Sequence, residues 1–369
     1  MRQLYLSGDH FAMGKQHGHQ VTDLKPHILS AIQHRLDKLA KVELNTGHLE
    51  EQMLESWHAQ AEPLLEMMQG IAEALSLDWR VFFRYTIATF LMDMARQPQV
   101  GDQGCTTWAV LSEATRDGIP LLVKNRDYWP DHQELQCLAH TRPDKGYVYL
   151  NMTSAGSPGV FSSGINETGL AVSDTHVSSL DIGPGLPRYY LMMEILEHHD
   201  TVHSAVDYLR SVNHAGNGTL LLLDANGEAA VFECGQIFSK SIPATNGFVV
   251  SANHYVTPAL RQKWMFRTTD RKLIGSSLHR YSRVKRALLK AKGSIDLNWA
   301  INLMRQHGTP LNAICRHPEL NPQSVTISSA IYLPTKKQLY LVNGIPCQNE
   351  YQVYPVIPDV QDEKQAYAL

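Results

Sequence analysis

The stretch Gly104-Cys105-Thr106-Thr107-Trp108 carries the strongest indication of fold and chemistry in this chain. A mostly polar run, residues 97–103, leads into Gly104, and the residues that follow Cys105 favour a β-strand. If the Gly104–Cys105 bond is cut, Cys105 gains an α-amine whose ordinary pKa is about 7.7–8.0, so that amine can act as base for the thiol. Taken alone, the pair favours a small buried side chain at a strand start, the usual fate of a free cysteine. The motifs downstream reverse that interpretation.

Composition limits the function classes that this chain can belong to. The 369 residues carry a formal net charge of −3, and the 33 basic residues are scattered among 36 acidic ones, which argues against a nucleic-acid partner. No apolar run reaches the roughly 18 residues of a membrane span, and the first ten residues show no apolar signal segment. We expect a cytoplasmic protein.

The cysteines indicate the redox compartment. There are five, at positions 105, 137, 234, 315 and 347, an odd number that is widely spaced and includes no CxxC pair. This pattern favours a reducing compartment over a disulfide framework or a zinc site. We therefore expect no metal and no cofactor.

The order of elements predicts a layered α+β protein. Residues 22–96 show apolar side chains at helical spacing, and Asp117-Gly118 between two apolar runs is typical of a hairpin turn. Further helices are expected at 188–212, 280–291 and 297–306. Strands are expected at 107–111, 120–124, 147–152, 159–161, 170–173, 219–223, 229–233, 248–252, 324–333 and 338–342. We place a boundary at Gly104, between an N-terminal helical segment (1–104) and a second domain (105–369).

Four further motifs belong with Cys105. The strand after the Asp117-Gly118 turn ends in Lys124-Asn125-Arg126-Asp127-Tyr128-Trp129, and a hairpin can return Asp127 toward Cys105, although a turn after a strand explains an Asp equally well. Asn253, in Ser251-Ala252-Asn253-His254-Tyr255, can donate its side-chain amide to an oxyanion, and it is otherwise a turn residue. The other two motifs are His279-Arg280-Tyr281-Ser282-Arg283, which also suits a solvated helix face, and the turn Gly164-Ile165-Asn166-Glu167-Thr168-Gly169-Leu170.

Together these motifs resemble the acyl-coenzyme A:6-aminopenicillanic acid acyltransferase (isopenicillin N acyltransferase)-like family of the Ntn-hydrolase superfamily, with choloylglycine hydrolases as more distant relatives. The resemblance rests on Gly-Cys-Thr-Thr, on Asn-x-Asp-Tyr with its Asp 22 positions after the Cys, and on the Asn-Glu-x-Gly-Leu turn. Ile314-Cys315-Arg316-His317 and the early glycines 8, 14 and 18 add to it. It runs in order over nearly the whole chain.

The resemblance implies an αββα four-layer sandwich and a precursor that cuts itself before its nucleophile. Cys105 would be that nucleophile, Asp127 the partner of its α-amine, Asn253 an oxyanion donor and Arg280 a support for the Cys and Asp. The implied activity is hydrolysis or acyl transfer at non-peptide amide bonds through a thioester, with a small-molecule acyl amide as substrate, acyl-coenzyme A as an alternative acyl donor, and a homo-oligomer left open.

Two departures from the relatives concern the substrate side of the site. Choloylglycine hydrolases carry Arg where this chain has Lys124, so we expect support of the thiolate either to be weaker here or to come from Arg126. His176 stands where relatives carry Asn. The residues that we expect to bind substrate are Arg126, Tyr128, His176 and His254.

Other interpretations are weighed beside this one. A papain-like pair would join Cys105 to His254 or His176, but Cys105 does not begin a helix. Histidine groups at 10, 17 and 19 and at 198, 199 and 203 suggest metal ligands, without a recognisable ligand motif. A binding protein that keeps the fold without activity is the non-catalytic alternative, which an intact Gly104–Cys105 bond in the mature protein would favour.

Overall fold

Two stacked β-sheets form the centre of the molecule. The computed structural model describes residues 1–42, 46–95, 104–265, 271–319 and 324–357. One sheet has eight strands in the order β1-β4-β5-β6-β7-β8-β9-β10, and the other has six in the order β11-β2-β3-β12-β13-β14. The strands of the first are β1 Arg2–Gly8, β4 Gln136–Pro143, β5 Tyr149–Ser154, β6 Ser163–Asn166, β7 Ala171–His176, β8 Gly218–Leu223, β9 Ala229–Cys234 and β10 Ser239–Pro243. Those of the second are β11 Phe248–Ser251, β2 Thr106–Val110, β3 Leu121–Tyr128, β12 Val325–Leu333, β13 Gln338–Asn343 and β14 Gln352–Pro355.

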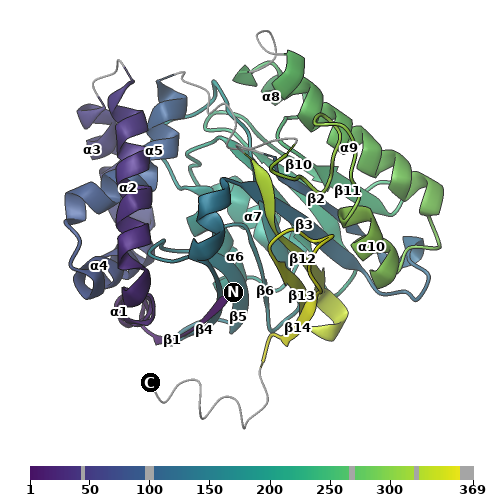
Figure 1. The fold of residues 1–369 in the computed structure, drawn as a ribbon, viewed down its shortest axis with the longest axis horizontal. Helices are drawn as coiled ribbons and strands as arrows, with labels where there is room; N and C mark the ends of the chain where they lie inside the picture. The colour runs from purple at the N-terminus through teal and green to yellow at the C-terminus, as the bar shows by residue number, and fades with distance from the viewer. Residues whose placement is uncertain (43–45, 96–103, 266–270, 320–323, 358–369) are drawn as a thin grey trace.

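Helices cover the outer face of each sheet, which makes four layers (Figure 1). Leu150 and Leu221 of the first sheet meet Leu122 and Tyr332 of the second in a buried core between the sheets. The helices over the first sheet are α1 His10–Gln20, α2 Lys25–Ala40, α3 Gly47–Gln60, α4 Glu62–Leu75, α5 Trp79–Met94, α6 Arg188–His198 and α7 Val202–Ser211. Over the second lie α9 Arg271–Ala291 and α10 Leu297–Met304, with the short α8 Pro258–Arg261 near them. The expected αββα sandwich is confirmed.

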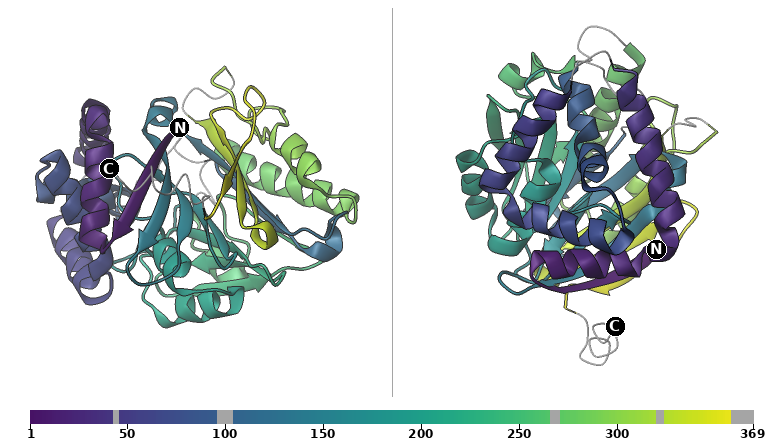
Figure 2. Two further views of the ribbon diagram at one scale, coloured as in Figure 1. Left: turned by 90° about the horizontal axis from the view of Figure 1, so that it is seen from below. Right: turned by 90° about the vertical axis from the view of Figure 1, so that its left-hand side faces the viewer.

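The first 104 residues are more than a helical segment. Helices α2 to α5 agree with the expected run over 22–96, but residues 2–8 form β1, which pairs in parallel with β4 inside the eight-stranded sheet. Helix α1 crosses α4 at close range, because a Cβ on Gly14 would lie 2.2 Å from the Met67 carbonyl oxygen. Figure 2 shows these N-terminal helices covering one side of the molecule. The N-terminal segment is thus built into the sandwich rather than attached to it.

Several strand predictions need correction. Gly159–Phe161 forms no strand, and β4, β6, β10 and β14 were not expected; β6 takes up the first part of the expected turn at 164–170. Strands β10 and β14 are mostly exposed edge strands, so they lack the apolar alternation that marks a half-buried strand. The β2–β3 pairing is confirmed, but the connection is the ten-residue loop 111–120, which holds the short 3-10 helix Ser112–Ala114; Asp117-Gly118, with a φ of 73° at Gly118, lies within this loop and forms no two-residue hairpin turn.

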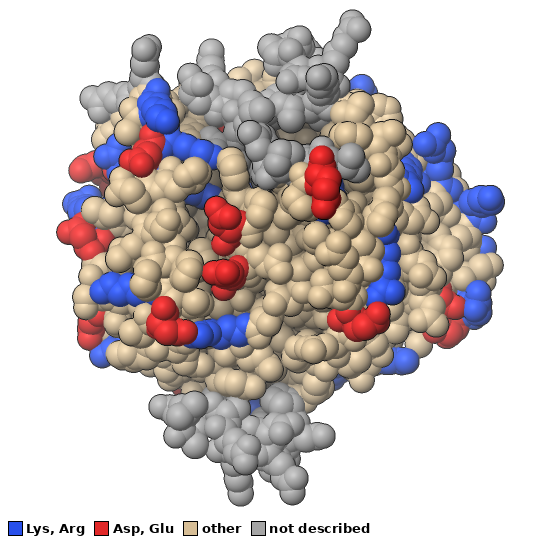
Figure 3. Space-filling model, in the orientation of Figure 1, with Lys and Arg blue, Asp and Glu red and all other residues tan. Residues whose placement is uncertain are grey.

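Surface properties are those of a mixed-charge protein. On the face drawn in Figure 3, the described basic and acidic side chains are interspersed rather than gathered into one basic surface. In the part of the chain that the structure describes, no helix combines the length and the apolar character that crossing a bilayer requires.

Candidate active site

The register of the six-stranded sheet brings the predicted site residues together. Strand β2 pairs with β3 on one side, Thr106 opposite Asn125, and with β11 on the other, Ser251 opposite Thr107. Continued past the end of β2, these registers set Cys105 between Arg126 and Asn253, and Gly104 beside Asp127. A nucleophile at this position is therefore flanked by a cation, an amide and a carboxylate, each supplied by a strand end.

Cys105 opens onto a pocket of about 900 Å³, a volume that includes the open mouth. Asp127, Arg126 and Tyr128 of β3 line it, together with His176 at the end of β7 and Asn253 after β11. Helices α2 and α5 close another side through Arg35, Thr86, Thr89 and Phe90. The N-terminal segment thus forms a wall of the site.

Asp127 is fully buried, and its two carboxylate oxygens differ in their surroundings. Oδ1 accepts a hydrogen bond from Thr326 Oγ1 at 2.7 Å. Oδ2 lies 3.3 Å from Arg316 Nε in an ion pair, yet it accepts no hydrogen bond from any residue that the structure describes. Burial raises the pKa of Asp127, while the charges of Arg316 and Arg280 oppose that rise. Asp127 Oδ2 is therefore a buried acceptor that could take a hydrogen bond from one further donor.

Gly104 lies against the same oxygen. A Cβ built on Gly104 would come within 2.3 Å of Arg316 Nη1 and within 2.6 Å of Asp127 Oδ2. Only a residue without a side chain fits here without moving the ion pair. The peptide bond between Gly104 and Cys105 therefore runs beside the acceptor that a new α-amine would need.

Arg280 connects Cys105 to Asn253. Its Nη1 donates to the Cys105 carbonyl oxygen at 2.6 Å and to Thr106 Oγ1 at 2.7 Å, and its Nη2 donates to Asn253 Oδ1 at 2.8 Å. The side chain is 1% exposed, and burial together with Arg316 lowers its pKa to about 9, so it stays cationic at neutral pH. By holding Oδ1, Arg280 fixes which end of the Asn253 amide carries the donor.

Asn253 Nδ2 has two hydrogens, and one of them has a partner among the described residues. It donates to the His176 carbonyl oxygen at 3.0 Å. The second hydrogen is the donor that an oxyanion beside Cys105 would take.

The two cations of β3 differ in what they contact. Lys124 Nζ donates to Asp174 Oδ1 at 2.6 Å and to the Ser162 carbonyl oxygen at 3.0 Å, so its charge is committed to the eight-stranded sheet. Arg126 Nη2 donates to Ser154 Oγ at 3.1 Å, whereas its buried Nη1 has no hydrogen-bond partner within the described ranges. Burial lowers the pKa of Arg126, and the charge of Cys105 acts against that shift. Arg126 is thus a cation of β3 with a donor available to a ligand.

Tyr128 and His176 both line the pocket, but His254 does not. The hydroxyl of Tyr128 accepts a hydrogen bond from Arg35. His176 Nε2 lies 2.8 Å from Asp93 Oδ2 on α5. His254 hydrogen-bonds through Nδ1 to Ser277 Oγ at 2.7 Å, and burial lowers its pKa to about 4. The substrate contact expected of His254 therefore has no support in its position.

Three site residues were missed by sequence reasoning. Arg316 and Thr326 hold Asp127, and Asp93 holds His176. The signal for Arg316 was present in Ile314-Cys315-Arg316-His317, which was read for resemblance alone. Thr326 and Asp93 reach the site only through tertiary packing, and nothing in their local sequence marks them.

Of the histidines considered as metal ligands, His198 lies with Glu194 and Glu197 in a group whose possible ligand atoms are within 4.8 Å of one another, whereas His10 and His17 have other partners. His17 is 1% exposed and its Nε2 accepts from the Gly156 N–H at 2.9 Å, while His10 Nε2 lies 3.0 Å from Glu197 Oε2. Elsewhere, the structure brings two histidines and two cysteines together, at positions 307, 315, 317 and 347, a cluster that cysteine spacing did not indicate. The remaining cysteines, Cys137 and Cys234, are fully buried, and burial raises the pKa of each thiol to about 12.

One curated relative is similar to more than half of this chain. It is a protein of Archaeoglobus fulgidus, described only as uncharacterized, with 23% identity over 239 residues. That match takes in 58% of this chain and 38% of the relative, so the chain spans about two fifths of that protein's length.

Three solved structures are also similar. A mutant of the conjugated bile acid hydrolase from Clostridium perfringens shares 16% identity, covering 68% of this chain and 96% of that one, with a TM-score of 0.45. Penicillin V acylase from Agrobacterium tumefaciens shares 16% identity, covering 65% of this chain and 83% of that one, with a TM-score of 0.43. The Caenorhabditis elegans ortholog of N-acylethanolamine-hydrolyzing acid amidase shares 14% identity, covering 63% of this chain and 93% of that one, with a TM-score of 0.42.

A family model describes most of the chain directly. The model of acyl-coenzyme A:6-aminopenicillanic acid acyl-transferase matches residues 114–348, which is more than half of the sequence. This match begins after Cys105, and it confirms the family resemblance that the motifs from Asp127 to His317 indicated. The chain belongs to the acyl-coenzyme A:6-aminopenicillanic acid acyl-transferase family.

Proposed function

We propose that this protein is a cysteine amidohydrolase or acyltransferase that acts on non-peptide amide bonds, with Cys105 as its nucleophile after self-cleavage at Gly104–Cys105. The observation that carries the proposal is the position of Asp127 Oδ2. This oxygen is buried, accepts no hydrogen bond from the described part of the chain, and lies against Gly104. A free α-amine on Cys105 is the donor whose chemistry suits it.

Self-cleavage begins with the thiol of Cys105 and the carbonyl carbon of Gly104. As the sulfur attacks, an S–C bond forms and the C–N bond breaks, which leaves a Gly104 thioester and a free α-amine on Cys105. Water then hydrolyses the thioester to a Gly104 carboxylate and the Cys105 thiol. Arg280 supports this step, because it anchors the Cys105 carbonyl oxygen while the bond on the other side of the residue changes.

Turnover uses the same groups. The α-amine takes the thiol proton, the thiolate attacks the acyl carbon, and the proton passes to the departing amine. The second hydrogen on Asn253 Nδ2 donates to the oxyanion, with Arg280 holding the amide in that orientation. The Asp127 carboxylate holds the charged form of the α-amine between steps. Water or a second amine then releases the acyl group from the thioester.

The pocket favours an acyl group with a large apolar part. Phe90, Val160, Phe161 and Tyr189 contribute apolar surface to its lining. Arg126, in the same lining, offers a donor for a polar or anionic group of the substrate. We therefore propose small-molecule N-acyl amides as the substrate class.

Acyl transfer to a second substrate is the alternative, and a neighbouring pocket favours it. This pocket, of about 930 Å³ with its open mouth, shares Arg35 and Tyr128 with the first. His27, His34 and Lys38 add basic groups to its lining. Such a space suits an anionic acyl donor such as acyl-coenzyme A or an acceptor amine.

A panel of N-acyl amides with matched acyl groups tests the proposal. Release of the amine is measured with water alone, with added amines, and with coenzyme A. Cys105→Ala serves as the inactive variant and Cys137→Ala as the matched control, since Cys137 is buried away from the pocket lining. Turnover by Cys105→Ala at the wild-type rate would remove Cys105 from the mechanism, whereas acyl transfer only with a second substrate would select the alternative.

A further inference from the structure

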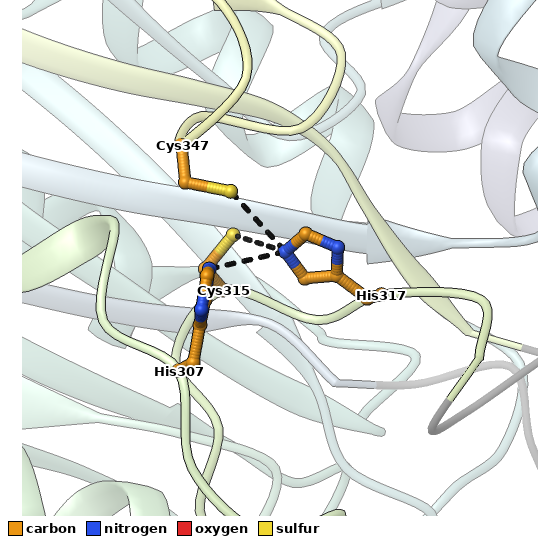
Figure 4. Close-up of side chains that lie close together, drawn as sticks. All are labelled: His307, Cys315, His317 and Cys347. Carbon is orange, nitrogen blue, oxygen red and sulfur yellow. Dashed lines mark hydrogen bonds between the residues drawn. The ribbon is translucent and has the colours of Figure 1, made fainter.

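Four side chains converge on one point at the end of the six-stranded sheet, away from the pocket lining. They are His307 after α10, Cys315 and His317 in the segment before β12, and Cys347 after β13. Their ligand atoms all lie within 4.8 Å of one another. Figure 4 shows both sulfurs and the ring of His307 gathered around one nitrogen of His317.

Three of the six separations between ligand atoms, those from His317 Nε2, are close to the edge lengths of a tetrahedral site, and the other three are at most 4.8 Å. His317 Nε2 lies 3.6 Å from Cys315 Sγ, 3.2 Å from Cys347 Sγ and 3.2 Å from His307 Nε2. Zinc binds thiolate sulfur at about 2.3 Å and imidazole nitrogen at about 2.0–2.1 Å. Tetrahedral geometry at those lengths puts ligand atoms roughly 3.3–3.8 Å apart. The side chains therefore need only small shifts to surround an ion.

Hydrogen bonding alone does not account for this crowding. His317 Nε2 has one position for a proton or a lone pair, but three polar atoms approach it. A cation at the centre would satisfy all four groups at once. The other nitrogen of His317, Nδ1, lies 3.8 Å from Glu319 Oε2, which is an ion-pair separation and longer than a hydrogen bond.

We propose that His307, Cys315, His317 and Cys347 bind one Zn²⁺ ion as a closed, structural Cys₂His₂ site. On binding, two S–Zn and two N–Zn bonds form, and the two thiol protons pass to solvent. The histidines use the lone pairs of their neutral Nε2 atoms. With four protein ligands the ion has no position open for substrate, so the site holds structure and does not take part in acyl transfer.

The site lies close in sequence to the nucleophile's support. Arg316 stands between two of the ligands, and its side chain extends to Asp127 and to Ser276 Oγ. Its backbone N–H donates to Thr326 Oγ1 at 2.8 Å, and Thr326 in turn holds Asp127. An ion bound by Cys315 and His317 would thus restrain the backbone on both sides of the arginine that positions Asp127.

Metal content of the purified full chain is the first test. Inductively coupled plasma mass spectrometry should find about one zinc ion per wild-type chain. Loss of a residue that only hydrogen-bonds to a metal ligand weakens metal binding about 10–100-fold. Loss of a ligand itself, in Cys347→Ser or His317→Gln, should therefore lower the zinc content at least about tenfold. Cys137→Ala and His58→Gln are the matched controls, since both residues lie outside the cluster, and both should retain the ion.

Cobalt substitution tests the wild-type chain without any variant. Co²⁺ bound to two thiolates and two imidazoles should give visible absorption bands of tetrahedral cobalt and a thiolate charge-transfer band, and added Zn²⁺ should abolish them. Wild-type protein that binds neither ion overturns the proposal. So does an intact mass lower by two hydrogens, since a Cys315–Cys347 disulfide would consume both thiols.

Discussion

Replacing Asp127 with asparagine removes the acceptor proposed for the Cys105 α-amine together with the anionic partner of Arg316. The amide oxygen of the Asp127→Asn side chain could still accept from Thr326 Oγ1, but an NH₂ group would take the place of Oδ2 and turn a donor toward Arg316 and Gly104. A hydrogen bond to a charged group contributes about 1.5–3 kcal/mol. At about 1.4 kcal/mol per tenfold change, kcat/KM should fall roughly 10- to 150-fold.

The fold should survive this substitution. Burial raises the pKa of Asp127 even though Arg316 and Arg280 are nearby, so the native structure holds the charged carboxylate against its desolvation. A neutral amide removes that penalty and offsets part of the lost ion pair. We therefore expect a thermal midpoint within about 4 °C of wild type, since 1 kcal/mol shifts the midpoint of a chain of this size by at most about 2–4 °C.

The assay compares kcat/KM on the best N-acyl amide, with processing followed by intact mass. Asp117→Asn is the matched control, because Asp117 lies in the exposed turn of the same hairpin and the change is the same. Wild-type kinetics and normal processing in Asp127→Asn, with Asp117→Asn equally active, would refute the role of Asp127.

Three further predictions concern the supports of the site and the fold. Arg280→Lys should lower kcat/KM at least about tenfold, because one ammonium group cannot hold both the Cys105 carbonyl oxygen and Asn253 Oδ1. Arg286→Lys, at an exposed position of the same helix, should leave kcat/KM unchanged. Equal rates for the two variants would remove Arg280 from the support of the site. Cys105→Ser should still be cut at Gly104 but turn over substrate poorly, which N-terminal sequencing and amine release can check; full activity would contradict the need for a thiol. Burial lowers the pKa of His17 from 6.5 to about 4 in the folded chain. Between these two pH values His17 is therefore protonated in the unfolded chain and neutral in the folded one. The free energy of unfolding should therefore fall as the pH drops from 6.5 to about 4, by about 1.4 kcal/mol per pH unit for this group; denaturant unfolding of His17→Gln should show a shallower decline, and an unchanged slope would exclude it.

Local sequence signals were enough to predict the part of the site that one hairpin and one neighbouring strand assemble. The antiparallel pairing of β2 with β3 sets Thr106 opposite Asn125, and that register returns Asp127 to Gly104. Asn253 follows in the same way, because β11 pairs with β2. These contacts depend on strand pairing, which alternation and turn residues encode.

The remaining parts depend on packing between elements far apart in the chain. Strand β1 pairs with β4 across more than a hundred residues, and its own seven residues do not specify that partner. His254 was expected to bind substrate as part of the Ala-Asn-His motif, but successive residues at a strand end point in different directions, and His254 packs against Trp264 and Tyr281 instead. The cluster of Cys315 and Cys347 escaped notice because spacing rules detect only ligands that are close in sequence.

Intact mass spectrometry of purified, active protein tests the central claim most directly. We predict two fragments, residues 1–104 and 105–369, with Cys105 at the new N-terminus. Brief exposure to substrate should add one acyl group to the larger fragment. Cys105→Ala should remain a single chain of about the 41.5 kDa of the full sequence and gain no acyl group. Fully active wild-type protein that keeps the Gly104–Cys105 bond, or an acyl group found on another residue, would contradict this mechanism.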